Sequence, residues 1–466
     1  MPPTATHFHK SSLIFILLIL VFSTFSKIFL FDTIYNQSPA SIQQNDTARY
    51  ETPALQLLAQ GTLAVVPMAP QTTTLSTTPV YSLFIAGVYK VFGVQNHYAL
   101  MVIQILLSTL SVFILFLIAY RLWGTRVALI AASFMAIAPL QILYSQLILS
   151  ETLFTLLFIT SLLAFTYLIT SPHKFTWAFI LGIFITLATM TRPISYYLVF
   201  CIILGIIIFK QRFTQSWSQL IIISLLILLP FLLVTHAWKV RNEKLTGVYA
   251  LNNAMSETML YWKAKGVIMI GSSLNNDEAQ QEIVKRLPTN LRTPLEQATA
   301  ETKLAKEIIL GDLGSYLKLT INGLKGIILG PGLSSQGGYY DLANKGRYQA
   351  TETTQPSFIR NIEEKTGYQL WYLSLILYSS LLLLLSYLFS TYGFYRAIKT
   401  GSSQATVVHI LMLGVIAYII LISTGHIAAD SRMRSPITPI FLLYAAYGIS
   451  EFTMRRKLKD KSYHHE

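Results

Sequence analysis

The sequence predicts an all-α polytopic membrane protein with about ten transmembrane helices. Of its 466 residues, 53% are hydrophobic and only 12% are charged, whereas a soluble domain carries roughly 25% charged residues. Apolar runs of about 20 residues, the length that crosses a bilayer, recur along the chain. The lysines and arginines cluster in short loops between these runs, so the net charge of +14 reflects membrane topology and does not indicate nucleic-acid binding.

Ten segments have the length and composition of a transmembrane helix. The segment Pro79–Gly93 is also apolar, but it is short and contains Lys90, which predicts a helix lying in the membrane interface. The ten expected spans lie near residues 12–31, 97–120, 127–146, 148–170, 175–191, 193–209, 216–238, 370–393, 404–424 and 436–453.

The loop charges predict that both termini are cytoplasmic. Loops containing Arg121, Lys174, Lys210 and Lys399 fall on the same side as the basic tail that follows Met454, as the positive-inside rule requires. Counting Pro79–Gly93 as an eleventh span would break this agreement. We therefore expect an integral protein of a bacterial inner (plasma) membrane, with its active site on the periplasmic or extracellular side.

This topology divides the chain into alternating membrane and outer regions. Within the second outer region, apolar and basic residues alternate at helical spacing over residues 305–329, which predicts a helix or helix pair on the membrane surface. The expected regions are a first transmembrane helix (1–31), an outer loop with interfacial helices (32–96), a six-helix core (97–238), an outer region (239–368), three C-terminal helices (369–454) and a basic cytoplasmic tail (455–466).

Two acidic residues and three arginines that are candidate site residues are all expected on the outer side of the membrane. Asp46 lies in the first outer loop, and Glu151 lies at the seam between two apolar runs, where a carboxylate is costly and suggests function. Arg192, Arg432 and Arg434 are outside, against the usual charge bias, and a guanidinium suits a phosphate group. The alternatives are that Asp46 caps a helix, that Glu151 reaches the headgroups, and that the arginines are anchors.

Lys239 and Arg241 close the seventh span on the same outer face, beside Trp238. They are either an interfacial belt or additional cations for an anionic substrate. The single cysteine excludes an internal disulfide, and the histidines do not have the spacing of metal ligands. No nucleotide-binding motif is present.

Five segments together resemble the GT-C superfamily of polyprenyl-phosphate-sugar glycosyltransferases, in particular the protein O-mannosyltransferase and aminoarabinose-transferase group. Each segment is weak alone, but their order and sidedness agree with the group along most of the chain. They are Asp-Thr-Ala-Arg-Tyr (46–50), Thr-Pro-Val-Tyr with Val-Phe-Gly (78–93), the run from Ala138 to Phe154, Gly182 through Thr-Arg-Pro (191–193), and Trp-Lys-Val-Arg-Asn (238–242).

The resemblance implies a helical fold with two outer helices near residues 46–61 and 79–93. It also implies a sugar donor on a polyprenyl phosphate and a hydroxyl acceptor (a glycan, lipid or protein), with Asp46 as the base of an inverting single displacement. Glu151 would orient substrate hydroxyls, or join Asp46 around a divalent ion. The expected substrate-binding residues are Tyr50, Arg192, Lys239, Arg241, Arg432 and Arg434.

The sequence departs from the protein O-mannosyltransferases at one point. Those enzymes usually carry an Asp-Glu pair where this chain has Asp46–Thr47, so the acceptor stays open. A transporter or flippase is the alternative of another class, and an oligosaccharide ligase or polymerase of the cell envelope is the alternative enzyme. Against transport, the sequence shows no repeated halves, and it has an outer region of about 130 residues that transport does not require.

Overall fold

A computed structural model of the chain describes residues 10–63, 66–69, 72–74, 77–214, 216–252, 254–332, 370–401 and 403–463. The predicted all-α class is confirmed, and the described residues add only one antiparallel β-hairpin, β1 (Val66–Ala69) with β2 (Thr72–Thr74). The first half contains the helices α1 (Lys10–Gln37), η1 (Pro39–Ile42), α2 (Thr47–Gln60), α3 (Pro79–Phe92), α4 (His97–Trp123), α5 (Thr125–Ala136), α6 (Pro139–Tyr144), α7 (Glu151–Thr170), α8 (Lys174–Thr189), η2 (Pro193–Ser195), α9 (Leu198–Ile208), α10 (Lys210–Phe213) and α11 (Trp217–Thr246).

The second half contains a group of short helices followed by the C-terminal spans. The short helices are α12 (Ala254–Glu257), the π-helix η3 (Thr258–Ala264), α13 (Lys265–Gly271), α14 (Asn276–Arg286), α15 (Pro294–Gly311) and α16 (Leu313–Leu329). The remaining helices are α20 (Leu370–Thr400), α21 (Ser403–Ser423), η4 (Ser431–Arg434) and α22 (Thr438–Tyr463).

Six helices of the described chain are long and apolar enough to cross a membrane: α1, α4, α7, α11, α20 and α21. All ten predicted segments are helical, but a count of ten spans is not confirmed. Pro139 divides the third segment into α5 and α6, because proline disrupts a continuous helix. The helices α8 and α9 have 16 and 11 residues, and the second half of α22 carries Glu451, Arg455 and Arg456.

Glycines let neighbouring helices approach closely at two crossings. A Cβ atom on Gly182 of α8 would lie 2.7 Å from the carbonyl oxygen of Leu226 in α11. Pro230 of α11 cannot donate to that carbonyl, so the part of α11 that lacks this helical hydrogen bond faces a residue with no side chain. At the second crossing, Gly393 of α20 and Gly448 of α22 each face backbone of the other helix with no room for a Cβ. These crossings fix the bundle that supports the site.

The predicted first outer loop contains two short helices, at the positions that the sequence predicted. The α2 helix ends at Gly61, whose φ of 73° is the left-handed conformation that glycine favours. Glu51 of α2 accepts hydrogen bonds from the Tyr89 hydroxyl of α3 at 2.5 Å and contacts His97 Nε2 of α4 at 2.6 Å. The two helices and the start of α4 are thereby tied together, which places residue 46 beside the bundle.

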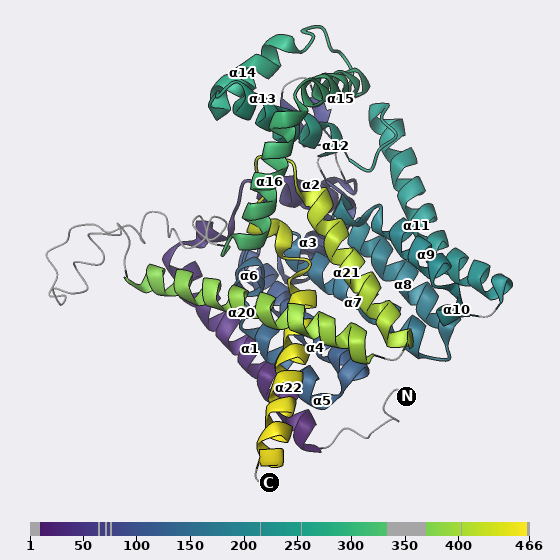
Figure 1. Ribbon diagram of the computed structural model, residues 1–466. Helices are drawn as coiled ribbons and strands as arrows, with labels where there is room; N and C mark the ends of the chain where they lie inside the picture. Colours follow the sequence, from purple (N-terminus) through teal and green to yellow (C-terminus); the bar gives the residue numbers. More distant parts are fainter. Residues whose placement is uncertain are drawn as a thin grey trace, which may run out of the picture.

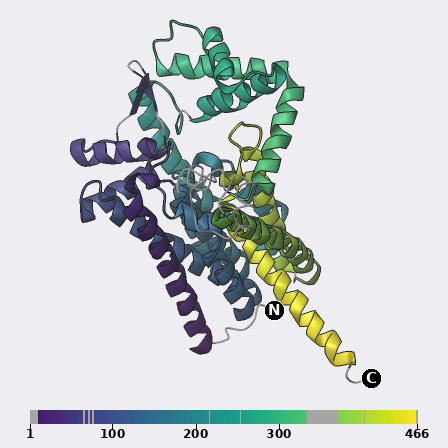
Figure 2. The same ribbon diagram turned by 90° about the vertical axis from the view of Figure 1, so that its left-hand side faces the viewer.

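Helices α12–α16, residues 254–329, pack around a second and smaller hydrophobic core; we call this unit the cap. Figure 1 shows the cap at the end of the bundle opposite the start of α1 and the end of α22. The predicted helix pair over residues 305–329 is found as α15 and α16, separated at Asp312. It does not lie flat, however, because α16 runs from the cap down toward the bundle in both Figure 1 and Figure 2.

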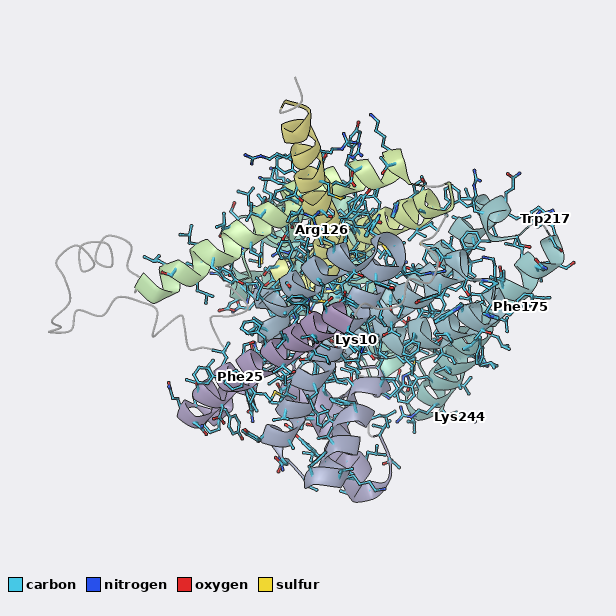
Figure 3. The ribbon with its side chains drawn as sticks, turned by 90° about the horizontal axis from the view of Figure 1, so that it is seen from below. Lys10, Phe25, Arg126, Phe175, Trp217 and Lys244 are labelled. Carbon is cyan, nitrogen blue, oxygen red and sulfur yellow. The ribbon has the colours of Figure 1, made fainter. Side chains whose placement is uncertain are left out.

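The outside of the bundle is apolar, as expected of a surface in lipid. Phe25, Phe175 and Trp217 are 68%, 45% and 63% exposed, and Figure 3 shows them around the rim in the view from below. Lys27 of α1 is fully buried instead and donates to Ser108 Oγ of α4 at 2.8 Å. The predicted core ended at residue 238, but α11 continues to Thr246, and residues 333–369 of the predicted outer region lie outside the described residues.

Candidate active site

Glu151 is a fully buried carboxylate at the first turn of α7. It is 1% exposed, and a chain of turns over residues 145–150 precedes it. The partial positive charge of a helix N-terminus favours an acidic residue in this place. A buried carboxylate still needs paired cations, and the bundle supplies two of them.

Arg192 and Arg432 both contact Oε1 of Glu151. The Nε atom of Arg432, from η4, donates to this oxygen at 2.5 Å. Nη1 of Arg192 forms an ion pair with the same oxygen. Arg192 has extended backbone just before Pro193, as the residue preceding a proline prefers. Two arginines that are far apart in the sequence thus contact the same oxygen atom of Glu151.

Asp46 joins this group through Arg432. Nη1 of Arg432 donates to Oδ2 of Asp46 at 2.8 Å, so one guanidinium bridges two carboxylates. Asp46 stands at the N-terminal boundary of α2 but makes no capping hydrogen bond, which disfavours the helix-cap alternative. The side chain of Asp46 is 32% exposed and that of Glu151 is 1% exposed. Asp46 is therefore the carboxylate that a substrate can reach.

The charges around Arg432 hold its guanidinium firmly in the ionised form. Burial opposes the charged form, but Glu151 and Asp46 raise the pKa of Arg432 well above its usual value. The Tyr50 hydroxyl accepts a hydrogen bond at 3.1 Å from Ser150, the residue before Glu151. Burial raises the pKa of Tyr50, so its hydroxyl stays protonated as a neutral group beside the ion pairs.

Two residues that are not among the predicted site residues, Arg49 and Glu257, extend the network into the cap. Arg49 lies one helical turn after Asp46, with its Nε atom 3.9 Å from Asp46 Oδ1. Its Nη1 atom is 3.6 Å from Oε2 of Glu257 in α12. Burial, with Glu301 nearby, raises the pKa of Glu257 despite the opposing Arg49. The i, i+3 spacing of Asp46 and Arg49 was a signal in the sequence, but nothing there indicated Glu257.

Lys239 and Arg241 do not contact the carboxylates of this group. Lys239 Nζ donates to the Tyr196 hydroxyl at 2.7 Å and lies 4.7 Å from the centre of the same ring. Tyr196 follows Arg192 by four residues. Arg241 donates to the Leu63 carbonyl and to Asn242 Oδ1, the latter at 2.9 Å. Their binding of substrate stays a prediction.

Arg434 has the surroundings of a structural residue. It is 4% exposed and donates to three backbone carbonyls near the end of α16: Ile327 at 2.5 Å, Ile328 at 3.0 Å and Gly330 at 2.7 Å. Helix C-termini present carbonyls without helical partners, and a cation there is favourable. Although Arg434 is only two residues from Arg432, its donors point away from Glu151.

The arrangement does not fit a divalent ion between Asp46 and Glu151, because Arg432 already bonds to both. No group of three His, Cys, Asp or Glu residues among the described residues could hold a metal ion. Oε2 of Glu151 is buried and has no hydrogen-bond partner in the described part of the chain. A buried acceptor without a donor is costly, so this oxygen is suited to a substrate hydroxyl or a water molecule.

Residues 76–236 of the chain match the family described as dolichyl-phosphate-mannose-protein mannosyltransferase. The match includes Glu151 and Arg192 and covers about a third of the chain, and it confirms the resemblance expected from the sequence. None of the curated proteins compared matches the chain.

Two solved structures of one archaeal enzyme share the fold. The apo oligosaccharyltransferase of Archaeoglobus fulgidus matches 98% of this chain with a TM-score of 0.57 at 12% identity. The same archaeal enzyme, in complex with an inhibitory peptide and a dolichol-phosphate, matches with a TM-score of 0.56 at 13% identity over 98% of this chain. In both matches this chain spans about half of the archaeal enzyme, 52%. ArnT from Cupriavidus metallidurans bound to undecaprenyl phosphate matches 94% of this chain and 77% of its own, with a TM-score of 0.43 at 12% identity.

Proposed function

We propose that this protein is a membrane glycosyltransferase that moves a sugar from a polyprenyl-phosphate donor to a hydroxyl acceptor. The observation that carries the proposal is the pair of guanidinium groups, Arg192 and Arg432, held on buried Glu151 beside the reachable carboxylate of Asp46. The mannosyltransferase family match over residues 76–236 and the fold shared with an oligosaccharyltransferase support it.

The two guanidinium groups of the site suit an anionic donor. Asp46 and Glu151 carry two negative charges, and Arg192 and Arg432 carry two positive charges. When a lipid phosphate arrives, Arg432 exchanges its bond to Asp46 for a bond to the phosphate, and Asp46 becomes available. Guanidinium groups form bidentate bonds with phosphate oxygens, so they stabilise the leaving group as the sugar–phosphate bond breaks.

Asp46 then acts as the general base. It accepts the proton of the acceptor hydroxyl while the acceptor oxygen bonds to the anomeric carbon. The sugar–phosphate bond breaks on the opposite face, and the polyprenyl phosphate leaves as an anion, so a single displacement inverts the anomeric centre. No general acid is required, because the phosphate is a stable leaving group.

Glu151 has a supporting role in this scheme. Its Oε1 atom orients both guanidinium groups, and its unpartnered Oε2 atom accepts a bond from a hydroxyl of the sugar or acceptor. The Tyr50 hydroxyl accepts a hydrogen bond from Ser150, the residue before Glu151. Lys239 and Arg241 are further cations for the donor in this scheme. The scheme uses these side chains alone.

The site belongs to the outer face of a plasma membrane in this proposal. The loop charges that predict cytoplasmic termini support it, as does the cap on the opposite end of the bundle from the start of α1. Reporter fusions at Lys174 and Lys263 are expected to report opposite sides, with Lys263 outside. A common side for both would refute the orientation.

The transfer reaction is tested with protein purified in detergent. Polyprenyl phosphate carrying radiolabelled mannose, and separately other sugars, is supplied with a panel of hydroxyl acceptors. We expect release of free polyprenyl phosphate and a labelled acceptor, and loss of both in an Asp46→Asn variant. A transporter would leave the sugar–phosphate bond intact. Mass spectrometry of cell-envelope glycans in a deletion strain would identify the sugar and the acceptor.

A further inference from the structure

The loop that carries Arg432 is attached to the cap as well as to its own helices. This loop, residues 424–437, connects α21 with α22, and we call it the arginine loop. Its Ile427 amide donates to the Trp262 carbonyl of the π-helix η3 at 3.0 Å. Gly266 of α13 leaves room for the Ile427 side chain, which a Cβ there would approach to 2.7 Å. The beginning of the arginine loop is thus held by the cap.

The C-terminal half of α16 forms the main contact with the arginine loop. On Gly323, a Cβ would lie 2.8 Å from Ala429 Cβ, and on Gly326 it would lie 2.5 Å from the Ala429 carbonyl oxygen. Real Cβ atoms essentially never approach closer than 3.0 Å. Only glycine therefore allows the arginine loop to lie directly on the backbone of α16 at this point.

Arg434 completes the attachment. It donates to three carbonyls at the C-terminal end of α16, as described above. The short helix η4 contains both Arg432 and Arg434, and a 3₁₀ helix has three residues per turn, so residues two apart face different sides. One side of η4 therefore faces α16, and the other faces Asp46 and Glu151.

We propose that α16 of the cap is a positioning element that sets the place of the Arg432 guanidinium, with Gly326 and Arg434 as its positioning residues. This inference rests on the proposed function, in which Arg432 binds the lipid phosphate. Arg49 and Glu257 make a second, longer connection between the cap and the same ion-pair network. A displacement of α16 relative to the bundle therefore moves Arg432 away from Asp46 and Glu151.

The test uses Gly326→Ala, with Gly314→Ala as a matched control on the same helix. A Cβ on Gly314 has its nearest neighbour at 3.5 Å, an ordinary contact. Binding of undecaprenyl phosphate and of dolichyl phosphate is measured with the full-length protein in detergent. We expect about tenfold weaker binding for Gly326→Ala and no change for Gly314→Ala. A misplacement of about 1 Å can cost on the order of 10²-fold in rate, and the displacement of Arg432 expected here is smaller.

A double-mutant cycle separates positioning from general damage. In an Arg432→Gln background, Gly326→Ala is expected to weaken binding no further, because the group that α16 positions is already absent. Equal weakening in both backgrounds, or wild-type affinity of Gly326→Ala, would overturn the inference. If Gly326→Ala does not fold, Arg434→Lys replaces it, because one ammonium cannot reach three carbonyls in a fixed geometry.

Thermal unfolding of the same four proteins gives a readout that needs no ligand. If α16 positions Arg432, the destabilisation of the double variant is smaller than the sum of the two single effects. Additive effects would overturn the inference whether or not lipid binds. Failure of the wild-type protein to bind any polyprenyl phosphate, together with a non-additive cycle in unfolding, would instead refute the proposed function and retain the positioning role.

Discussion

Neutralising the buried carboxylate is the most direct perturbation of the site. The substitution Glu151→Gln keeps the shape of the side chain and changes the summed charge of Asp46, Glu151, Arg192 and Arg432 from zero to +1. Breaking one side of a buried ion pair costs about 3–5 kcal/mol. Arg192 and Arg432 are 15% and 24% exposed, and Arg432 retains Asp46 as a partner, so we expect the lower end, about 3 kcal/mol.

In free energy, the effect on turnover should be about as large as the effect on folding, since a 10²-fold loss corresponds to about 2.7 kcal/mol. Both guanidinium groups lose the atom that orients them, and misplacement of positioning groups by about 1 Å costs on the order of 10² in rate. We would measure donor turnover and thermal unfolding of Glu151→Gln in detergent. A fall of several degrees in Tm is expected together with a turnover loss of about 10²-fold.

A matched control lies at the other end of the bundle. Glu451 pairs with Arg396 at 2.9 Å and is 16% exposed, so Glu451→Gln also breaks an ion pair between helices. It should lower thermal stability and leave turnover unchanged. Wild-type turnover of Glu151→Gln would refute the role of Glu151 as the residue that orients the arginines. Equal turnover losses in the two variants would attribute the effect to general destabilisation.

Three further predictions follow from the same geometry. Asp46→Asn should lower turnover by about 10²–10⁴-fold, the usual effect of losing a general base. Its Tm should fall less than that of Glu151→Gln, because Asp46 is 32% exposed and Arg432 retains Glu151 as a partner; near-normal turnover would exclude Asp46 as the base. Replacing Arg192 or Arg432 by lysine should lower donor turnover at least about tenfold, because an ammonium lacks the planar, bidentate donor geometry of a guanidinium. The control Arg126→Lys, at the far end of the bundle, should keep its turnover. Equal activity in all three variants would make the arginines anchors. Burial, assisted by Lys263, lowers the pKa of His426 to about 4. The stability that the neutral histidine contributes is therefore complete above about pH 6.5, and up to about 3 kcal/mol of it is lost as the pH falls toward 4. The Tm of His426→Gln should vary less with pH over this window than the Tm of the wild type, and parallel curves would contradict the prediction.

The sequence predicted the helices well because the signal for them is local. Apolar runs and charge bias located ten helical segments, and the short length of Pro79–Gly93 separated α3 from the spans. The number of spans could not be predicted as well. Pro139 interrupts one apolar run, and charged residues occupy the second half of α22, so these segments contain shorter apolar helices than the average hydropathy suggests.

Part of the site could be predicted from sidedness alone. Asp46, Glu151, Arg192 and Arg432 were expected on one face, and the structure brings them into direct contact. The place of Arg434 could not be predicted, because its carbonyl partners belong to the cap, and charge patterns do not say where the cap lies. Glu257 was missed for the same reason.

The pairing of Arg432 with Glu151 has a consequence for how the protein is made. Their contact spans 281 positions of the sequence, and the contact of Arg432 with Asp46 spans 386. At about 5–20 residues per second, translation places roughly 15–60 s between the emergence of Glu151 and that of its second cation. During this time the carboxylate has only Arg192 as a partner within the membrane. A chain that stops before the last loop therefore has two carboxylates, Asp46 and Glu151, and only one of their two arginines, and quality-control proteases of the membrane would have a physical basis for telling unfinished chains from complete ones.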